Sequence, residues 1–440
     1  MRAFSGVALV LSCLAAFEAH TFVQGQYLPY EKAAPVFAAL GERMPAEREW
    51  GRWIAAADAA TRARVVRGDE AAIVNLLLFG TSFTTQPRIT TPQLDPETIQ
   101  RSVSARIDDF ERALAKAGTN ERLQFARRLL PEGTAVRPRL LAMIDQTMKE
   151  REALARLTAD AAALGDPSLE FAERSRVYRG RGIASDTSVR VNFAVDEALR
   201  RLQVDGLMAG QVRRVAVIGP GLDVVDKQQG YDFYPPQTIQ PFAIVDSLIR
   251  LGLAQAETLH VTTFDVSGRV NDHLVDMVRR AGGGAPYVLH VALPGDVGWS
   301  SGLLSYFAKF GETVGSQLPV AIPPGVGALR LRAIAVRPPV ASRISARDLN
   351  ITAQHVPLAD AERFDLVVAT NVFVYYDRLQ QGLAMVNVAG MLRPGGILLA
   401  NNALVEVPSA GMRSMGYSKT VYSNRDEDGD LVIWYQKDMN

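Results

Sequence analysis

Residues 213–223 read RRVAVIGPGLD, and this stretch decides the fold. Its apolar run, residues 215–218, has no polar interruption and stops at Gly219-Pro220-Gly221. A strand that is buried on both faces of a parallel sheet has this pattern when it ends in a tight turn. Such a turn needs glycine where the backbone comes close to a ligand, because a Cβ would occupy the space. The stretch therefore predicts a small nucleotide-like ligand at the carboxyl end of a central strand.

Other interpretations of the same glycines depend on their neighbours. A Gly-x-Gly after a strand can also be a turn and nothing more. A dinucleotide fingerprint requires a third small residue, so that the helix packs closely on the strand, and Val224 stands at that position. No Gly-Lys-Ser/Thr follows the glycines, which excludes a phosphate-binding P-loop. The sequence beyond the turn must decide between a simple turn and a ligand site.

The composition is that of a globular protein with two or three domains. The chain has 440 residues, of which 48% are hydrophobic, and this is enough for sizeable cores. Its 48 basic and 47 acidic side chains give a net charge of +1, so no overall field favours nucleic acid or an anionic membrane. No apolar run reaches the ~20 residues that a spanning helix needs. We expect no nucleic-acid partner and no integral membrane domain.

The first 25 residues have the pattern of a secretory signal peptide. A positively charged start precedes an apolar stretch, residues 3–16, and small and polar residues follow as far as Gln26, so cleavage near Gly25 would fit. The protein would then be exported, to the periplasm or beyond the cell. An uncleaved anchor or a different start codon are the alternatives, and without a signal the protein would be cytoplasmic. The single cysteine, Cys13, lies here in a stretch that loosely resembles a lipoprotein cleavage box, so the mature chain would contain no disulfide.

Residues 26–203 are expected to form an all-helical N-terminal domain. The clearest helix begins at Asp95-Pro96, a cap followed by proline at the first helical position, and repeats apolar residues at spacings of three and four until Gly118. The threonine- and proline-rich segment 80–94 is an exposed loop, either a linker or a substrate-facing flap. Further helices are expected at residues 47–66, 69–79, 121–130, 137–164, 168–178 and 189–202.

Four arginines lie close together near the end of this region, at Arg174, Arg176, Arg179 and Arg181. They are either solvated at a domain junction, or one guanidinium group binds a carboxylate of a cofactor or substrate. Shortly after them, Ser185 or Asp186 could cap the next helix.

Residues 204–440 predict an α/β domain. A second strand, residues 258–264, ends in Asp265, and a carboxylate at a strand tip can accept hydrogen bonds from both hydroxyls of a ribose. The polar and aromatic segment 226–234, which follows the glycine turn, is either a lid or a plain surface loop. Residues 281–339 exceed the length of a minimal crossover, so they are expected to add a small subdomain.

A second informative stretch is FDLVVATNVFVYYD, residues 364–377. A buried strand, residues 364–369, ends at Thr370-Asn371, and an aromatic loop then leads into a helix. An Arg-Pro-Gly-Gly turn precedes a strand at residues 397–401. The last segment, residues 419–436, reads as an antiparallel hairpin around an acidic turn.

Together these segments resemble the class I S-adenosylmethionine-dependent methyltransferases over residues 213–437. The matching parts are VAVIGPG, the acid Asp265, FDLVVATNVFVYYD, LRPGGILL and the closing hairpin. The resemblance implies an α/β fold with a Rossmann-like methyltransferase sheet, parallel apart from one antiparallel C-terminal strand, preceded by the all-helical N-terminal domain.

Within the class the chain is most similar to the chemotaxis-receptor glutamate methyltransferases. These proteins have RNVLIYF in the corresponding loop and also carry an N-terminal helical domain. Thr370 stands in place of their arginine, and their Gly-Glu-Glu after the first strand is absent. The resemblance therefore implies methyl transfer without indicating a receptor as the acceptor.

The resemblance also implies the site residues. Gly219 and Gly221 would admit the methionine part of S-adenosylmethionine, with Asp223 near its ammonium group, and Asp265 would hold the ribose. Asp348 and Leu349 would border the adenine. The cofactor-binding set is completed by Val266 and Thr370. The residues expected to face the methyl acceptor are Asn371, Tyr375 and Tyr376, and packing in a core explains the two tyrosines equally well.

Three functions are compatible with these observations. The first is methyl transfer to an oxygen or nitrogen nucleophile of a small molecule or a protein side chain. The alternative is an exported, non-catalytic binding module that retains the fold, because an exported enzyme would meet little of this cytosolic cofactor. A nucleotide-sugar or dinucleotide enzyme would need a small residue in place of Val224. The sequence predicts no metal site, and it specifies neither the acceptor nor the oligomeric state.

Overall fold

The computed structural model describes residues 25–89, 96–130, 135–164, 178, 180–208, 211–226, 230–324, 326–426 and 428–439. The expected signal segment before Gly25 lies outside the described residues, as do Arg174, Arg176, Arg179 and all but the last residue of the helix expected at 168–178. In the described part of the chain, no helix is both long enough and apolar enough to cross a membrane.

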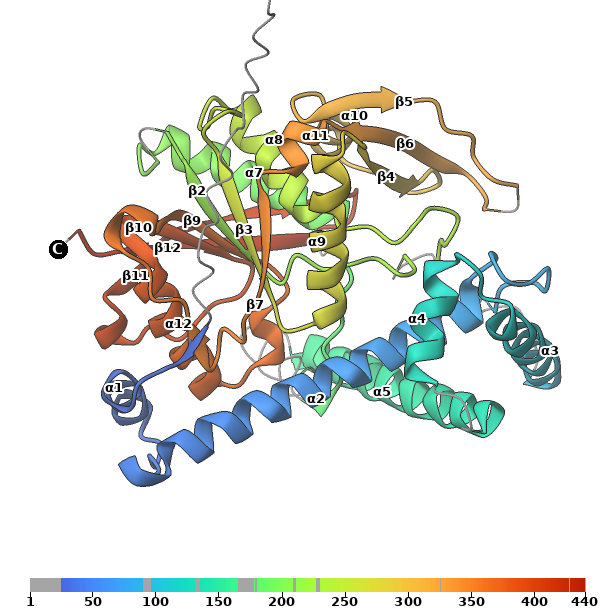
Figure 1. Ribbon diagram of the computed structural model, residues 1–440, viewed down its shortest axis with the longest axis horizontal. Coiled ribbons are helices and arrows are strands. Elements are labelled where there is room, and N and C mark those ends of the chain that lie inside the picture. The colour runs from blue at the N-terminus through green and yellow to red at the C-terminus, as the bar shows by residue number, and fades with distance from the viewer. Residues whose placement is uncertain are drawn as a thin grey trace, which may run out of the picture.

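A seven-stranded sheet forms the centre of the protein (Figure 1). Five neighbouring strands are parallel, and one strand close to the C-terminus lies antiparallel between two others. In spatial order the strands are β11 (Met412–Val421), β12 (Gly429–Lys437), β10 (Leu392–Ala400), β9 (Phe364–Ala369), β2 (Arg214–Ile218), β3 (His260–Asp265) and β7 (Ile344–Asp348). The antiparallel strand is β12. A mostly parallel, Rossmann-like sheet is therefore confirmed.

The strand order fixes where a ligand can bind. From β2 the chain builds outward through β3 to β7, and it then returns to the other side of β2 with β9 and β10. The topological switch point therefore lies between β2 and β9. Ligands of open parallel sheets bind outside the carboxyl ends of the strands at this point.

Both faces of β2 are buried, as its unbroken apolar sequence predicts. Val215 and Val217 pack into the core on one face, and Ala216 and Ile218 pack into the core on the other. Successive side chains of a strand point to opposite faces, so each residue of this run has a core to enter.

Helices cover the two faces of the sheet. On one face lie α7 (Val189–Val204), α8 (Gln240–Arg250) and α9 (Gly268–Gly282), and on the other lie α1 (Tyr30–Leu40), α12 (Arg378–Met391) and the first turns of α2 (Glu47–Phe79). The other helices of the N-terminal half are α3 (Pro96–Ala115), α4 (Glu121–Leu129) and α5 (Val136–Leu164).

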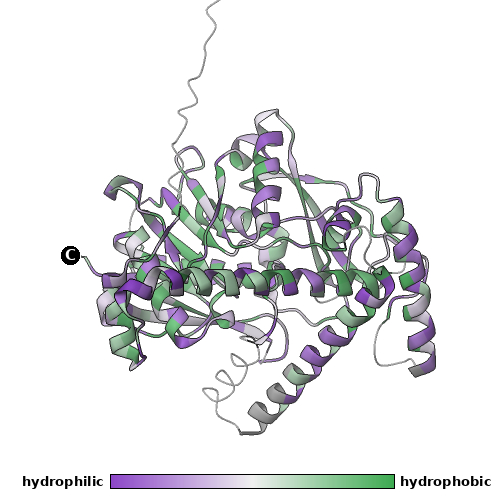
Figure 2. Ribbon diagram, turned by 60° about the horizontal axis from the view of Figure 1, so that its bottom comes forward, coloured by the Kyte–Doolittle hydropathy of each residue, from purple (hydrophilic) through white to green (hydrophobic). Residues whose placement is uncertain are grey.

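The described helices of the N-terminal half divide between different hydrophobic cores. Helix α2 runs from α1, at the sheet, to the group formed by α3, α4 and α5, and it carries hydrophobic and hydrophilic residues along its whole length (Figures 1 and 2). Its second half forms its own core with these three helices, whereas α7 belongs to the core of the sheet. Apolar periodicity shows that a helix buries one face but does not show against which partner, so this division was not predicted. The domain boundary expected at residue 203 stays a prediction.

A small three-stranded antiparallel sheet, in the order β4-β6-β5, follows α9 and precedes β7 in the chain, within the residues where a subdomain was expected. Its elements are β4 (Tyr287–Pro294), α10 (Ser301–Lys309), β5 (Gly315–Leu318), β6 (Leu329–Val336) and α11 (Pro338–Ala341). The remaining short elements are β1 (Gln26–Tyr27), which pairs with β8 (Gln354–His355), and the 3-10 helices η1 (Asp360–Glu362), η2 (Phe373–Tyr375) and η3 (Pro408–Ala410).

Helix α2 is continuous through Gly68, although the sequence predicts two helices there. A second segment, residues 181–188, crosses α2 at this glycine, and we call it the linker because it leads into α7. A Cβ on Gly68 would overlap the carbonyl oxygen of Ile183, and a Cβ on Gly182 would overlap the backbone of Gly68. Glycine at position 68 thus allows a crossing of two backbones and does not end the helix.

Replacing Gly68 with alanine should lower the free energy of unfolding by about 2 kcal/mol, because the linker or the helix must move to admit a methyl group. Gly51 provides a matched control, since it lies in the same helix and a Cβ there would meet no atom within 4 Å. Gly51→Ala should raise the stability by up to about 1 kcal/mol. Urea denaturation of the two variants measures both changes, and equal effects would contradict the crossing.

Candidate active site

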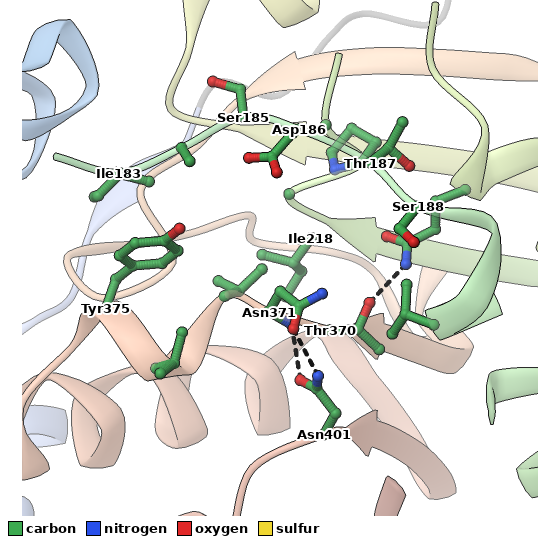
Figure 3. A pocket seen from close by; sticks show the side chains of 18 of the residues that line it. Ile183, Ser185, Asp186, Thr187, Ser188, Ile218, Thr370, Asn371, Tyr375 and Asn401 are labelled. Carbon is green, nitrogen blue, oxygen red and sulfur yellow. Dashed lines mark hydrogen bonds between the residues drawn. The ribbon is translucent and has the colours of Figure 1, made fainter. Parts of the chain in front are cut away.

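A cavity of about 440 Å³ lies at the carboxyl ends of β2, β3 and β9 (Figure 3). Its size and its position at the topological switch point are typical of a ligand site. Most of the site residues expected from the sequence line it: Gly219, Gly221, Asp265, Val266, Leu349, Thr370, Asn371, Tyr375 and Tyr376. Asp223 and Asp348 do not.

The glycine turn after β2 is approached closely by the chain itself. Gly219 and Gly221 have φ angles of +65° and +74°, in the left-handed region that favours glycine. A Cβ on Gly221 would lie 2.9 Å from the carbonyl oxygen of Asp186 in the linker, and one on Gly219 would lie 2.7 Å from a methyl group of Val372. Side chains are excluded at these two positions because the linker and the loop after β9, which contains Val372, pack against the turn. A ligand in the cavity would be a further reason for glycine here.

Hydrogen bonds fix the linker in this position. The backbone N–H of Ile183 donates to the carbonyl oxygen of Arg64 in α2 at 2.9 Å, and the N–H of Leu222 donates to the carbonyl oxygen of Ser185. The linker thereby forms one wall of the cavity, where residues 183–188 meet the glycine turn (Figure 3).

Asp223 holds the linker and does not face the cavity. Its carboxylate is buried, with 3% of the residue exposed, and accepts a hydrogen bond from the backbone N–H of Thr187 at 3.0 Å. Burial raises its pKa well above the ordinary value for aspartate. The side chain of Asp223 thus points toward the linker and does not line the cavity, and its expected place near a ligand's ammonium group stays a prediction.

Asp265 lies in the cavity at the end of β3, as expected. Its Oδ1 accepts a hydrogen bond from the backbone N–H of Ser267 at 2.8 Å, and only 8% of the residue is exposed. Burial raises the pKa of this carboxyl group to about 7, and the Ser267 hydrogen bond opposes that shift. The next residue, Val266, also lines the cavity.

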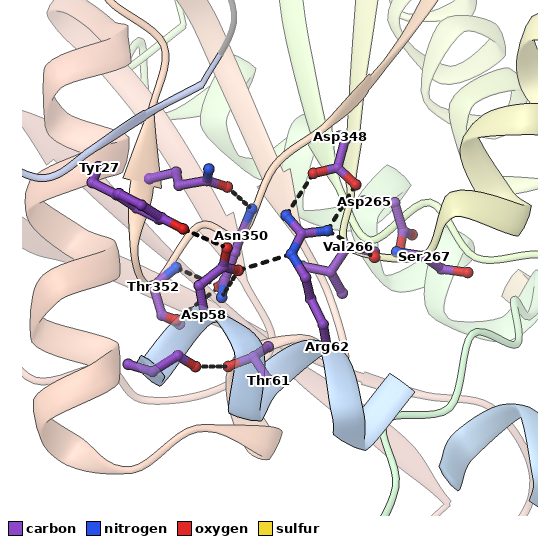
Figure 4. Close-up of polar contacts among 12 residues, drawn as sticks. Tyr27, Asp58, Thr61, Arg62, Asp265, Val266, Ser267, Asp348, Asn350 and Thr352 are labelled. Carbon is purple, nitrogen blue, oxygen red and sulfur yellow. Dashed lines mark hydrogen bonds and ion pairs between the residues drawn. The ribbon is translucent and has the colours of Figure 1, made fainter. Parts of the chain in front are cut away.

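Asp348 forms an ion pair with an arginine of α2 and does not line the cavity. Figure 4 shows Arg62 of α2 reaching across to it, with Nη1 and Nη2 donating to the Asp348 carboxylate at 2.8 and 2.6 Å. The neighbouring Leu349 is 1% exposed and does line the cavity. Successive residues at the end of a strand point to opposite sides, so Leu349 lines the cavity and Asp348 does not. The expectation that Asp348 borders an adenine stays a prediction.

The end of β9 is held by amide side chains. Thr370 accepts a hydrogen bond from Gln240 Nε2 at 2.6 Å. The backbone N–H of Asn371 donates to Asn401 Oδ1 at 2.7 Å, and Asn401 Nδ2 donates back to Asn371 Oδ1 at 2.8 Å (Figure 3). Asn371 has a φ of +59° and is the one non-glycine among the described residues with a positive φ. Such backbone strain is common at functional sites.

Tyr375 and Tyr376 line the cavity although both are buried, with 5% and 3% of each residue exposed. The ring of Tyr375 meets the ring of Tyr178 edge to face, with centroids 5.5 Å apart. Burial raises the pKa of Tyr376, so its phenol stays protonated at neutral pH and can donate a hydrogen bond.

One end of the cavity is polar, and its residues were not predicted from the sequence. Arg190 of α7 pairs with Asp428 at 3.1 Å, and the Tyr422 hydroxyl donates to Asp430 at 2.5 Å. The acidic turn of the C-terminal hairpin was a visible signal for these residues, but nothing local placed it beside β9. Further lining residues not predicted are Ser185, Ser188, Gln240, Asn401 and Asn402.

The described residues of segment 226–234, which are residue 226 and residues 230–234, do not line this cavity. Asp232 accepts hydrogen bonds from the backbone N–H groups of Thr81 and Ser82 at 2.9 Å, and Arg122 of α4 donates to the carbonyl oxygen of Tyr234. The described residues of this segment thus join the sheet domain to α4 and to the residues that follow α2. Among the residues that the structure describes, no cluster of three or more side chains could hold a metal ion.

Comparison with protein-family models and with curated protein sequences gave no match. Solved structures that are similar include the glycopeptide N-methyltransferase MtfA complexed with sinefungin, at 11% identity over 56% of this chain and 94% of that one, with a TM-score of 0.25. A TehB-like SAM-dependent methyltransferase from Corynebacterium glutamicum has 11% identity, covers 55% and 96%, and has a TM-score of 0.25. The magnesium protoporphyrin IX methyltransferase ChlM from Synechocystis with bound SAM has 12% identity, covers 56% and 79%, and has a TM-score of 0.24. These TM-scores are too low to support an argument about this chain, so its fold is described by its own strand order.

The left-handed backbone conformation of Asn371 should make this position sensitive to a β-branched residue. Asn371→Val and Asn371→Gly both lose the side-chain hydrogen bond to Asn401, but only valine is strained at a positive φ. The valine variant should therefore lose about 1–2 kcal/mol more of its free energy of unfolding than the glycine variant. Urea denaturation of the pair measures the difference, and equal losses would show that the left-handed backbone is absent in solution.

Proposed function

We propose that this protein is an S-adenosylmethionine-dependent methyltransferase. The single observation that supports this most is the cavity itself, because a bare glycine turn and a buried carboxylate lie at the ends of neighbouring strands, Gly219 to Gly221 after β2 and Asp265 at the end of β3. This arrangement suits a nucleoside, whose ribose hydroxyls can donate to the carboxylate. The sequence resemblance to class I methyltransferases points to the same ligand.

The residues present fit the cofactor. Asp265 would hold the ribose, while Val266 and Leu349 supply apolar walls for the adenine. The bare turn at Gly219 and Gly221 would admit the methionine part. Asn402 also lines the cavity, and its buried Oδ1 has no hydrogen-bond partner in the part of the chain that the structure describes. A buried acceptor of this kind is costly unless a ligand or water donates to it.

The chemistry requires little from the protein beyond alignment. S-adenosylmethionine, when bound, supplies a methyl group on a sulfonium that is already a good leaving group. Asn371 and Tyr375, at the end of β9, would orient the acceptor, and the linker would exclude water. Tyr376 would donate a hydrogen bond from its protonated phenol.

The acceptor is proposed to be an oxygen or nitrogen nucleophile of a small molecule or a protein side chain. It would enter at the polar end of the cavity, beside Asn401, Tyr422 and Asp430. The similarity to the chemotaxis-receptor subfamily does not extend to Thr370, whose hydroxyl is bound by Gln240. A receptor glutamate is therefore not part of the proposal.

Calorimetry with S-adenosylmethionine tests the proposal directly. The wild-type protein should bind it, and Asp265→Ala should weaken binding at least about tenfold, because hydrogen bonds to a charged group are lost. Asp272→Asn, on the exposed side of α9, is the matched control and should bind as the wild type does. If the wild type shows no binding, the proposed function is wrong.

Binding should also depend on pH. Because the carboxyl group of Asp265 has a pKa of about 7, it is protonated below this value and ionised above it. Only the carboxylate accepts hydrogen bonds from both ribose hydroxyls, so affinity should rise about tenfold between about pH 6 and about pH 8. Asp265→Asn should remove this rise. A rise that persists in Asp265→Asn would show that another group titrates.

A further inference from the structure

A second cavity, of about 350 Å³, lies on the other side of the linker from the first. Its walls come from the second half of α2, from α5, from the start of α9 and from residues 222–225 after the glycine turn. Tyr178, Ala184, Ser185 and Asp186 line both cavities, so the linker separates them. The proposed methyl transfer uses none of the side chains that only the second cavity contains.

Three arginines line this second cavity, each from a different segment: Arg151 from α5, Arg181 from the linker and Arg269 from α9. Each guanidinium group lies over an aromatic ring. Arg269 is 4.4 Å from the ring centroid of Phe125, Arg181 is 5.0 Å from that of Tyr178, and Arg151 is 5.7 Å from that of Phe79. Rings that hold the guanidinium planes reduce the entropy lost when an anion binds.

The pairing of these arginines is incomplete. Arg269 Nη2 donates to Asp69 at 2.7 Å, and Arg151 Nη2 donates to Asn75. However, Nε of Arg181 and both Nε and Nη1 of Arg269 are buried without a hydrogen-bond partner among the described residues. Buried guanidinium N–H groups are costly when no acceptor is present. A ligand with acceptor oxygens would remove this cost.

The arginines that line the cavity are not all paired with a carboxylate. The lining contains Glu150 and Asp186, and Asp69 pairs with Arg269, so the formal charges balance. Neither Arg151 nor Arg181, however, forms an ion pair with a carboxylate of the described residues. The Asp186 carboxylate lies among the side chains of the first cavity in Figure 3. Burial lowers the pKa of Arg151, and the like charge of Arg181 lowers it further. An anion between the two arginines would oppose both effects.

Much of the remaining lining is apolar, and the polar residues Asn75, Thr147 and Ser185 also contribute to it. Ala71, Ala72 and Phe79 of α2 contribute on one side, and Leu222, Val224 and Val225 contribute on the other. A hydrated inorganic ion would leave this surface uncovered. An organic anion with an apolar body would cover it and present its charge to the arginines.

We propose that the second cavity binds a small organic oxyanion, with its carboxylate or phosphate group at Arg151, Arg181 and Arg269 and its apolar body against α2 and residues 222–225. A carboxylate and a phosphate each present two oxygens that can accept two parallel hydrogen bonds from one guanidinium group. The site is distinct from the methyl-transfer site and does not require S-adenosylmethionine.

Calorimetry of the full chain with three related probes tests this proposal. Phenyl phosphate and phenylbutyrate carry the two candidate anionic groups, and phenylbutanol is the neutral match. At least one anion should bind about tenfold tighter than the alcohol. Binding of phenyl phosphate alone would identify a phosphate ester as the ligand class, and binding of phenylbutyrate alone would identify a carboxylate.

Two variants locate the binding. Arg181→Met and Arg151→Met keep the aliphatic contact with the aromatic ring and remove the charge, so each should weaken anion binding at least about fivefold. Arg279→Met, at a position whose side chain is 74% exposed, is the matched control and should bind as the wild type does. Circular dichroism confirms that each variant is folded. Anions that bind no tighter than phenylbutanol, or that bind both folded arginine variants as they bind the wild type, would overturn the proposal.

Discussion

The structure depends on the contact between the linker and two glycines that have no room for a side chain. At Gly68 the linker crosses the middle of a long helix, and at Gly221 it packs on the turn that follows the central strand. Both contacts join backbone to backbone, so they tolerate little displacement. Through them the position of α2 determines the shape of the cavity at the edge of the sheet. The helical half of the chain is thus part of the site and does more than cover it.

This constraint explains why one segment borders two cavities. The linker is a single segment of chain between the two cavities, and its residues 184–186 line the first cavity and the arginine-lined cavity alike. Tyr178 makes the same connection with one ring, which meets Tyr375 on one side and supports Arg181 on the other. Occupation of either cavity would therefore press on the same short segment.

The sequence predicted those parts of the site that depend on strands. A buried parallel strand is an unbroken apolar run, so the residues at the ends of β2, β3 and β9 could be placed at one edge from the amino-acid pattern alone, and Asp265 and Asn371 lie there. Asp223 and Asp348 were assigned from the resemblance to a family, but the direction of a side chain after a turn depends on what packs against it, and neither residue lines the cavity. The helix break expected at Gly68 was wrong for a related reason, because sequence does not distinguish a glycine that ends a helix from one that lets another backbone pass. The arginine cluster was visible only in part, since Arg151 and Arg269 come from distant segments that the fold brings to Arg181.

Amide hydrogen exchange with and without S-adenosylmethionine tests most directly whether the linker and the strand ends form one ligand site. If they do, the cofactor should slow exchange in four segments together: the linker at 183–188, the glycine turn, residues 265–267 and residues 370–376. Residues of α3 and α4, which lie away from the cavity, should exchange as before. Slower exchange at the strand ends with no change in the linker would contradict the account, because the ligand would then bind to a sheet edge that the helical half of the chain does not enclose.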